Sequence, residues 1–400
     1  MKERLNKRII FLITSLYITY FVSIGFFIEA FIAILRKNGA SLEFISLVYM
    51  IGLFGVFKFL WAPIIDRFNF GQFGHYKVWI IISQFLMTIV LFFIFTLNIS
   101  TNLNIIVILV FIFTFCSSFL NVSLDAFVYK ISFQKDYSTI SAIKGASGLI
   151  GMVLGGGLGL IIYNKIDWQY TISFLGIITS LSLLLIFFYK EPLKNDYLKK
   201  MIDYKQFFTF WNTKRKMVWL LLLLVYSSTI SATFGILTPI LVDLNWSLDD
   251  IGVIVYMIGY SFGIVSSFGA SYLIQKFGKK TILISASFGQ IIVILLLLIL
   301  FSHNNIFIVI FIVSLIFIIQ IPAFVLINTL IMDLSSNDSP AFQIAMQSGI
   351  FVLSTIIFSS LAIFIAGKYG YDNAIYLFAI LGIFSVYLST KIDYVLDNKK

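Results

Sequence analysis

Long apolar runs separated by short polar segments recur from one end of this 400-residue sequence to the other. Each run approaches or exceeds the roughly 20 residues that a helix needs to cross a ~30 Å hydrocarbon core. Only five prolines interrupt the chain, so helices explain the runs better than the alternating pattern of a membrane β-barrel does. The pattern predicts an all-α integral membrane protein with twelve transmembrane helices, at residues 9–35, 42–64, 78–97, 104–129, 140–163, 169–189, 217–242, 249–274, 281–301, 305–331, 341–366 and 373–390.

The composition supports the same class, because 60% hydrophobic residues against 12% charged residues cannot be enclosed in one soluble domain. The first run exceeds a signal-peptide core and lacks a small-residue cleavage site, so we expect it to be retained. A single cysteine, Cys116, excludes an intrachain disulfide and weighs against a cysteine-based metal cluster. His75 and His303 cannot supply a zinc or Ser/His/Asp site at one membrane depth, although an enzyme using carboxylates alone stays open.

The distribution of cations predicts how the chain is oriented, because Lys and Arg near the ends of spans stay preferentially on the cytoplasmic side. With both termini cytoplasmic, that side collects 23 of the 28 cations, including a dense run between Lys190 and Lys216. The opposite side has four, namely Arg36, Lys37, Lys165 and Lys368. The net charge of +10 therefore reflects the orientation of the chain in the membrane. We expect no nucleic-acid partner, since the aromatic residues lie mainly in the spans and not among the cations.

The pentapeptide VYMIG occurs twice, at residues 48–52 and 255–259. Both copies fall early in the second predicted helix of a six-helix set, and each of these helices is followed by a short basic loop. Chance can match five apolar residues in so biased a composition, but the equivalent positions favour a duplication. Two six-helix bundles with a charged connector are typical of a transporter whose solute site lies between the halves. We predict bundles at 1–189 and 217–400, joined by a cytoplasmic connector at 190–216.

Each of these basic loops carries a short motif. In the second half it reads QKFGKK at 275–280, which resembles the loop motif of the major facilitator superfamily, with glutamine where an aspartate is usual. In the first half Asp66 and Arg67 match the start of the motif, and a longer stretch follows. We expect Asp66, Arg67 and Lys276 to form a cytoplasmic gate, in which Asp66 pairs with a cation or a helix N-terminus of the opposite bundle. A solvated loop anion is the alternative role of Asp66.

Three further stretches resemble the AmpG-like permeases within that superfamily: KFLWAPIIDRF at 58–68, GHYKVW at 74–79 and SLDAFVYK at 123–130. This group includes importers of cell-wall muropeptides, a branch of siderophore permeases and acetyl-CoA carriers. The resemblance implies the major facilitator fold of two six-helix bundles. Twelve spans, a short tail and the GHYK piece favour the siderophore branch over the muropeptide permeases, which often carry additional spans. Fold alone does not decide the substrate.

Three charged residues stand out within predicted spans, namely Glu29, Lys58 and Asp125. A charge at the centre of a membrane helix costs about 2.5–3.5 kcal/mol on insertion scales, so such residues usually face a cavity or a partner. Asp125 shares a helix face with Asn121 and lies at a similar depth to Lys58, which predicts that Lys58 and Asp125 pair or lie close. A purely structural ion pair is the alternative. We expect Glu29 to exchange protons, although snorkelling to the outer interface and binding a cationic part of the solute stay open.

Neutral polar residues in the spans suit hydrogen bonding to a large polar solute, and each taken alone is more often an interhelical hydrogen bond. The candidates for the solute cavity are Asn121, Tyr226, Thr229, Gln320, Asn328 and Gln347. Glycines recur at every fourth position of two predicted helices, namely Gly151, Gly155 and Gly159, then Gly259 and Gly263. The resemblance implies that these two helices face each other, so we expect sliding surfaces, with static close packing as the alternative.

The duplicated bundles, the sparse buried charges and the lack of a P-loop favour a secondary transporter that works by alternating access. We predict proton-coupled movement of an organic solute across the bacterial inner membrane, with siderophore import as the preferred function. Anhydromuropeptide import and a non-transporting membrane sensor are the alternatives. The expected energy source is the proton gradient, without a cofactor. The expected partners are a small-molecule solute and the lipid bilayer, and we expect a monomer.

Overall fold

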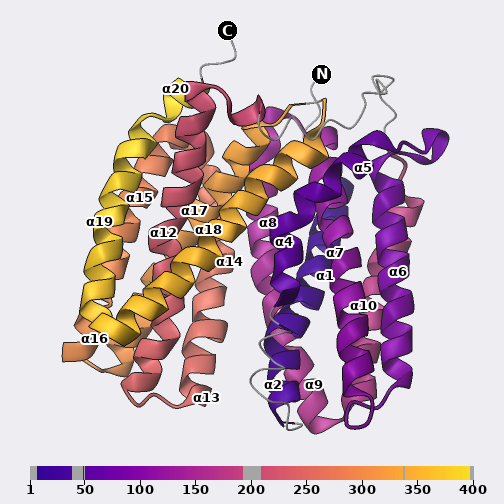
Figure 1. Ribbon diagram of the computed structural model, residues 1–400, viewed down its shortest axis with the longest axis horizontal. Coiled ribbons are helices and arrows are strands. Elements are labelled where there is room, and N and C mark those ends of the chain that lie inside the picture. The colour runs from indigo at the N-terminus through magenta and orange to yellow at the C-terminus, as the bar shows by residue number, and fades with distance from the viewer. Residues whose placement is uncertain (1–6, 38–47, 49, 192–208, 337, 397–400) are drawn as a thin grey trace. The chain divides into compact units, whose positions relative to one another are not determined.

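The computed structural model describes residues 7–37, 48, 50–191, 209–336 and 338–396, and its regular elements in these ranges are helical (Figure 1). Eleven helical segments in this part of the chain are long and apolar enough to cross a membrane, and they correspond to eleven of the predicted spans. The remaining span, 42–64, begins outside the described residues and continues as short helical turns between Met50 and Arg67. The predicted all-α membrane fold is confirmed.

Four helices extend well beyond the predicted spans and have 29 or 30 residues each: α7 (Leu103–Ile131), α12 (Lys214–Asp243), α17 (Ile306–Leu334) and α18 (Pro340–Tyr369). At ~1.5 Å per residue such a helix is roughly 45 Å long, which matches the bilayer with its headgroup regions. Apolar runs report only the hydrocarbon part of the bilayer. The polar turns at the helix ends therefore fell outside the predicted boundaries.

The chain divides into two compact units. Unit 1 comprises residues 1–136, 147–203 and 335–346, and unit 2 comprises 137–146, 204–334 and 347–400. Two helices, α8 (Tyr137–Met152) and α18, therefore contribute residues to both units. The predicted bundle boundaries stay a prediction, because most of the connector at 190–216 lies outside the described residues.

The remaining elements of unit 1 are α1 (Lys7–Gly25), the π-helical turn η1 (Phe26–Ala30), α2 (Phe31–Lys37), η2 (Met50–Gly52), α4 (Leu53–Phe57), η3 (Lys58–Leu60), α5 (Ala62–Arg67), η4 (Gly71–Phe73), α6 (Tyr76–Thr96), η5 (Gln134–Asp136), the π-helical turn η6 (Val153–Leu158), α9 (Gly159–Lys165) and α10 (Trp168–Phe188). Figure 1 shows α6, α7 and α10 running side by side, and α6 packs against both neighbours. Helix α1 packs against α10 and η6. An aromatic cluster fills this part of the unit, with ring centroids of Phe26, Phe27, Phe31, Phe113 and Trp168 separated by 4.9 to 6.5 Å.

The remaining elements of unit 2 are α13 (Leu248–Ile251), the π-helical turn η7 (Gly252–Gly259), α14 (Tyr260–Phe277), α15 (Lys279–Leu296), α16 (Ile299–Ser302), α19 (Tyr371–Thr390) and α20 (Ile392–Leu396). Helix α15 packs against α17 and α19, while α12 packs against α19 and α14 against α17. Small hydroxyl side chains link these helices, as between Ser287 and Ser389, whose oxygens are 2.9 Å apart. Such interhelical hydrogen bonds matter in a membrane because lipid is as apolar as the helices themselves.

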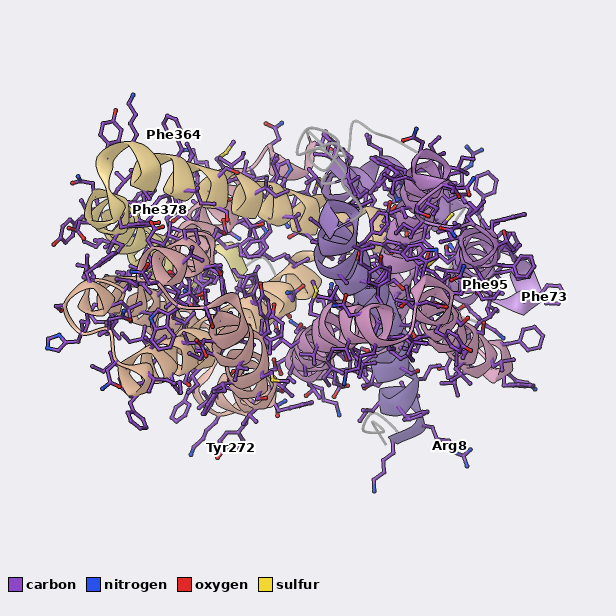
Figure 2. The ribbon with its side chains drawn as sticks, turned by 90° about the horizontal axis from the view of Figure 1, so that it is seen from below. Arg8, Phe73, Phe95, Tyr272, Phe364 and Phe378 are labelled. Carbon is purple, nitrogen blue, oxygen red and sulfur yellow. The ribbon has the colours of Figure 1, made fainter. Side chains whose placement is uncertain are left out.

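Large apolar side chains cover the outside of both units. Figure 2 shows Phe364 of α18 projecting from the ribbon, and this residue is 61% exposed. Phe188 at the end of α10 is 80% exposed. In water such a surface would be unfavourable, so it fits a protein whose surroundings are lipid.

Both copies of the repeated pentapeptide depart from regular α-helix. Val255–Gly259 lies in the π-helical turn η7, and the end of the first copy forms the 3₁₀ turn η2. Wider or tighter turns of this kind often mark functional positions in helices.

Candidate functional site

A buried polar cluster lies inside unit 1, where η3, α7 and α1 meet. The ammonium nitrogen of Lys58 donates a hydrogen bond to Asn121 Oδ1 at 2.7 Å and lies 4.0 Å from Asp125 Oδ2. The hydroxyl of Tyr17 donates to Asp125 Oδ1 at 2.8 Å. None of these four residues is more than 6% exposed. The structure thus brings together the predicted residues Lys58, Asn121 and Asp125, and it adds Tyr17.

The local sequence explains how this cluster forms. Asn121 and Asp125 are four residues apart on α7, so their side chains lie on one face of that helix. Lys58 begins η3, whose tight turn separates α4 from α5. Tyr17 was missed because the sequence has 20 tyrosines and its partner lies 108 residues away. The only available signal for Tyr17 was its amphipathic ring, which lies one helix turn from other polar residues.

Glu29, the third charged residue predicted to function within a span, belongs to the π-helical turn η1. Its side chain lies outside the described part of the structure. Its roles in proton exchange, in snorkelling or in solute binding therefore stay predictions.

A second polar site in unit 1 is built around Asp66, at the end of α5. Its carboxylate accepts hydrogen bonds from the backbone N–H groups of Ala341 at 3.1 Å and Phe342 at 2.8 Å. The Tyr76 hydroxyl donates a third, at 2.8 Å. Helix α18 starts at Pro340, and the first N–H groups of a helix have no partner within the helix and carry partial positive charge. Asp66 therefore caps the N-terminus of α18.

The environment of Asp66 places its titration close to neutrality. Burial raises the pKa of this carboxyl from 3.8 to about 6, against the opposing effects of the hydrogen bonds from Phe342, Tyr76 and Ala341 and of the Lys130 charge. At neutral pH the group is mostly ionised, although its burial disfavours the charge. Mild acid is enough to protonate it.

The corresponding position of the second half carries Gln275, and its contacts lie within unit 2. The Gln275 amide nitrogen lies 3.1 to 3.3 Å from the hydroxyl oxygens of Thr139, Ser271 and Ser138. Thr139 and Ser138 belong to the first turn of α8, so both motif copies contact the start of a helix. Only the first copy does so with an ionisable group.

Arg67 and Lys276, the other two predicted gate residues, are exposed. The guanidinium carbon of Arg67 lies 5.7 Å from the centre of the Phe68 ring. The Lys276 ammonium lies 5.5 Å from the Tyr272 ring and 5.3 Å from the Phe277 ring. These are contacts with close neighbours in sequence, so among the three residues Asp66 has the long-range contacts.

The predicted solute contacts of the second half lie in unit 2, and Tyr226, Thr229, Gln320 and Gln347 have an exposed fraction of 0%. Gln347 Oε1 accepts a hydrogen bond from the Trp219 indole at 2.7 Å, and Thr229 donates to the Phe378 carbonyl at 3.2 Å. Asn328 donates to a carbonyl of its own helix, that of Phe324, at 2.9 Å. The contacts of Gln347 and Thr229 match the interhelical alternative. Solute binding by these residues stays a prediction.

A cavity of about 330 Å³ lies in unit 2 between α12, α17 and α18. Its lining includes the aromatic residues Phe234, Phe324 and Phe351 and the hydroxyl residues Ser231 and Ser359. This combination of aromatic faces and a few hydroxyls is common in small-molecule sites. None of the predicted solute contacts lines this cavity.

The glycine row of the first half allows close packing against α1. A Cβ atom at Gly151 would overlap Phe21 and Val22 of α1. At Gly155 it would overlap the carbonyl oxygen of Val22 and the backbone nitrogen of Phe26, the first residue of η1. A Cβ atom at Gly159 would lie 2.9 Å from the Phe26 ring. The row therefore packs within unit 1, and its predicted sliding role stays a prediction.

The glycine row of the second half makes similar contacts in unit 2. A Cβ atom at Gly259 would overlap the ring of Phe317 on α17 and would lie 3.1 Å from Val313. Gly263, which lies in α14, is also buried. Close packing against a neighbouring helix is thus the observed contact, as in the first half.

Sequence comparisons assign most of the chain to one family. Residues 9–347 match the Major Facilitator Superfamily. The protein designated AmpG 3 of Rickettsia typhi is 24% identical over 238 residues, which cover 55% of this chain and 57% of that protein. The anhydromuropeptide permease of Escherichia coli K12 is 26% identical over 130 residues, 32% of this chain and 26% of the permease. The chain thus matches about half of the first relative and about a quarter of the second.

Solved structures share the fold at low sequence identity. The human organic anion transporter MFSD10 (TETRAN) superimposes with a TM-score of 0.78 at 12% identity, covering 97% of this chain and 100% of that one. A bacterial homologue of the iron transporter ferroportin, in an outward-facing state, gives a TM-score of 0.73 at 14% identity, covering 98% and 100%. This likeness shows the fold, and the eleven membrane-length helices of the described residues fit a multi-pass membrane protein. The family match over residues 9–347 shows that the chain belongs to the Major Facilitator Superfamily.

Proposed function

We propose that the protein is a proton-coupled secondary transporter that imports an anhydromuropeptide across the bacterial inner membrane by alternating access. Family membership supports transport rather than catalysis. The solute class follows the names of two relatives, AmpG 3 and the anhydromuropeptide permease. These relatives favour what the sequence analysis held as the alternative solute, and the preferred siderophore branch has no support among them.

The observation that carries the coupling mechanism is the placement of Lys58 between a neutral and a charged partner. Its ammonium donates to the Asn121 amide at 2.7 Å and lies 4.0 Å from the Asp125 carboxylate. Protonation of Asp125 would remove a negative charge beside Lys58, while Asn121 would still accept a hydrogen bond from the ammonium. Lys58 can thus be held in both charge states of Asp125, which is what a proton carrier needs.

The same cluster links three elements of unit 1. Tyr17 on α1 donates to Asp125 on α7, and the Lys58 ammonium of η3 lies 4.0 Å from the same carboxylate. A charge on Asp125 strengthens both contacts, because hydrogen bonds and ion pairs to an ionised group are stronger than those to a neutral one. Proton binding would therefore loosen α1 and η3 from α7, and this is our proposed connection between protonation and helix movement.

The contacts of Asp66 support its role as the cytoplasmic gate. Helix α18 contributes residues to both units, and Asp66 holds its first N–H groups in unit 1. Breaking these bonds would release the start of α18 from unit 1. Movement of one bundle against the other, as in alternating access, would use such a release.

The remaining assignments belong to the same proposal. Glu29 stays a second candidate for proton binding, next to Asp125. We further propose that the proton gradient supplies the energy, that the transporter works as a monomer and that both termini are cytoplasmic.

Uptake by cells that lack their own permeases tests this function. Labelled anhydromuropeptide and labelled ferric siderophore are offered in parallel, with and without a protonophore. We expect accumulation of the anhydromuropeptide that collapses with the protonophore. Accumulation of the siderophore alone would contradict the proposed solute, and uptake that resists the protonophore would contradict proton coupling.

A pair of lysine variants connects this assay to the cluster. Lys58→Met removes the buried cation and should reduce uptake at least about tenfold, since losing one partner of a buried charged pair costs several kcal/mol. Lys280→Met is the matched control, because Lys280 pairs with Asp393 at 2.6 Å on the exposed surface. It should transport nearly as the unmodified protein does. Equal uptake by Lys58→Met would remove the cluster from the mechanism.

A further inference from the structure

The GHYK segment at residues 74–77 has no role in the function proposed so far, and its backbone is held by a distant carboxylate. Glu191 Oε2 accepts hydrogen bonds from the N–H groups of His75 at 2.8 Å and Lys77 at 3.0 Å. These groups are the start of α6. Glu191 follows the end of α10 and stands near the start of the predicted connector, so a residue 114 to 116 positions away caps this helix.

The sequence around this contact suits it closely. Gly74 has a φ of +105°, which favours glycine, and a Cβ atom there would lie 2.6 Å from Glu191 Oε2. The Lys77 ammonium donates to the Phe187 carbonyl at 2.9 Å, in the last turn of α10. A carboxylate therefore meets the N-terminus of α6 and an ammonium meets the C-terminus of α10, and each charge is favourable at that end of a helix. Glu191 and Lys77 therefore hold the start of α6 against the end of α10 and the start of the connector.

The same segment also holds Asp66. His75 is buried, and its Nε2 lies 2.6 Å from the carbonyl oxygen of Ile65, the residue before Asp66. The next side chain, Tyr76, stacks on His75 with ring centres 4.2 Å apart and donates its hydroxyl to Asp66 Oδ1. Both residues next to the Glu191 contact thus reach the end of α5. All of these contacts lie within unit 1.

We propose that Glu191 is a positioning residue of the Asp66 gate: it fixes the start of α6, and through His75 and Tyr76 it holds Asp66 where the N-terminus of α18 can reach it. A shift of the connector would thus be felt at the gate. This inference rests on the gate role of Asp66 in the proposed function. It gives GHYK a specific task, in which the glycine makes room, the histidine and tyrosine hold α5, and the lysine holds α10.

A labelling experiment tests this role without any solute. In the full-length protein with Cys116→Ser, the variant Ala341→Cys introduces one cysteine at the start of α18, where Ala341 is 1% exposed. A maleimide should react slowly while Asp66 holds this turn and faster when the turn is released. Asp66→Ala removes both acceptor oxygens and provides the released reference.

We expect Glu191→Ala to raise the labelling rate about tenfold, because it removes charge-assisted hydrogen bonds. Glu191→Gln keeps an acceptor oxygen and should lie between Glu191→Ala and the unmodified residue. Asp167→Ala is the matched control, since Asp167 also caps a helix, accepting from the Tyr170 N–H at 2.9 Å, but at the start of α10. This control should react with the maleimide at the same rate as the protein that carries only Cys116→Ser and Ala341→Cys. Comparable amounts of monodisperse protein establish that each variant is folded.

The outcomes separate this inference from the function on which it rests. Faster labelling in Asp66→Ala together with unchanged labelling in both Glu191 variants would overturn the positioning role and leave the gate intact. Equal acceleration by Asp167→Ala would also overturn the positioning role, because any lost helix cap would then release α18. Unchanged labelling in Asp66→Ala would overturn the gate and the positioning role together.

Discussion

Asp66 combines a buried carboxylate with three hydrogen-bond donors, and burial outweighs the donors, so its pKa lies at about 6. A carboxyl group in water titrates near pH ~3.9. The latched state, in which Asp66 holds the first N–H groups of α18, therefore binds the proton more tightly than an opened, hydrated state would. By linkage, acid favours the latched state, and ionisation above pH 6 favours opening.

We predict that exchange of labelled for unlabelled solute, with equal pH on both faces, rises with pH and has its midpoint near 6. Asp66→Asn cannot ionise, so it should flatten this part of the profile. Asp372→Asn, which changes an exposed aspartate of α19, should leave it in place. The charge of Lys130 acts on Asp66 throughout this range, and burial lowers the pKa of His75 to about 4. If the midpoint near 6 persists in Asp66→Asn, a group other than Asp66 causes it. Glu191 is then the next residue to test, because burial raises the pKa of Glu191 as well.

At this same scale, the sequence predicted those site residues that contrast with their surroundings. Lys58, Asn121 and Asp125 interrupt apolar runs, so their positions were visible, and helical spacing put two of them on one face. Tyr17 fits an apolar run as well as a polar contact, and nothing local marks it. Glu191 stands beyond the last span of its half, and its partner segment becomes apparent only when the chain is folded.

At the scale of elements, the glycine rows indicate how closely two helices approach. The spacing of Gly151, Gly155 and Gly159 predicted a smooth helix face, and the structure has one. The partner of that face could not be predicted, because a row of missing side chains carries no information on what fills the groove. In the described residues it is α1, and the close approach falls where α8 widens into the π-helical turn η6.

We predict that Gly155→Ala lowers the stability of the detergent-solubilised protein by about 1–3 kcal/mol, because the added methyl group overlaps the carbonyl oxygen of Val22. Thermal unfolding measures this effect as a lower midpoint. Gly157→Ala is the matched control in the same turn, since a Cβ atom there meets nothing within 4 Å. Equal midpoints for the two variants would show that α1 can move aside without cost.

At the scale of the whole molecule, the spans were predictable because bilayer thickness fixes the length of an apolar helix. The loop motif and the stretch at 58–68 also predicted the superfamily to which the chain belongs. The preferred solute branch found no support, since it rested on the number of spans and on GHYK. The number of spans describes architecture, and GHYK contacts α5, α10 and the start of the connector. Neither feature reports on solute contacts.

If the cluster of Lys58, Asn121, Asp125 and Tyr17 couples protons to solute movement, solute that enters a proteoliposome must bring protons with it. Purified protein is reconstituted with a pH-sensitive dye inside, and anhydromuropeptide is added outside without an imposed pH gradient. We expect the lumen to acidify with the unmodified protein and with Asp372→Asn. With Asp125→Asn we expect no acidification, although solute exchange continues. Solute-dependent acidification that persists in Asp125→Asn would show that the cluster does not couple protons to the solute.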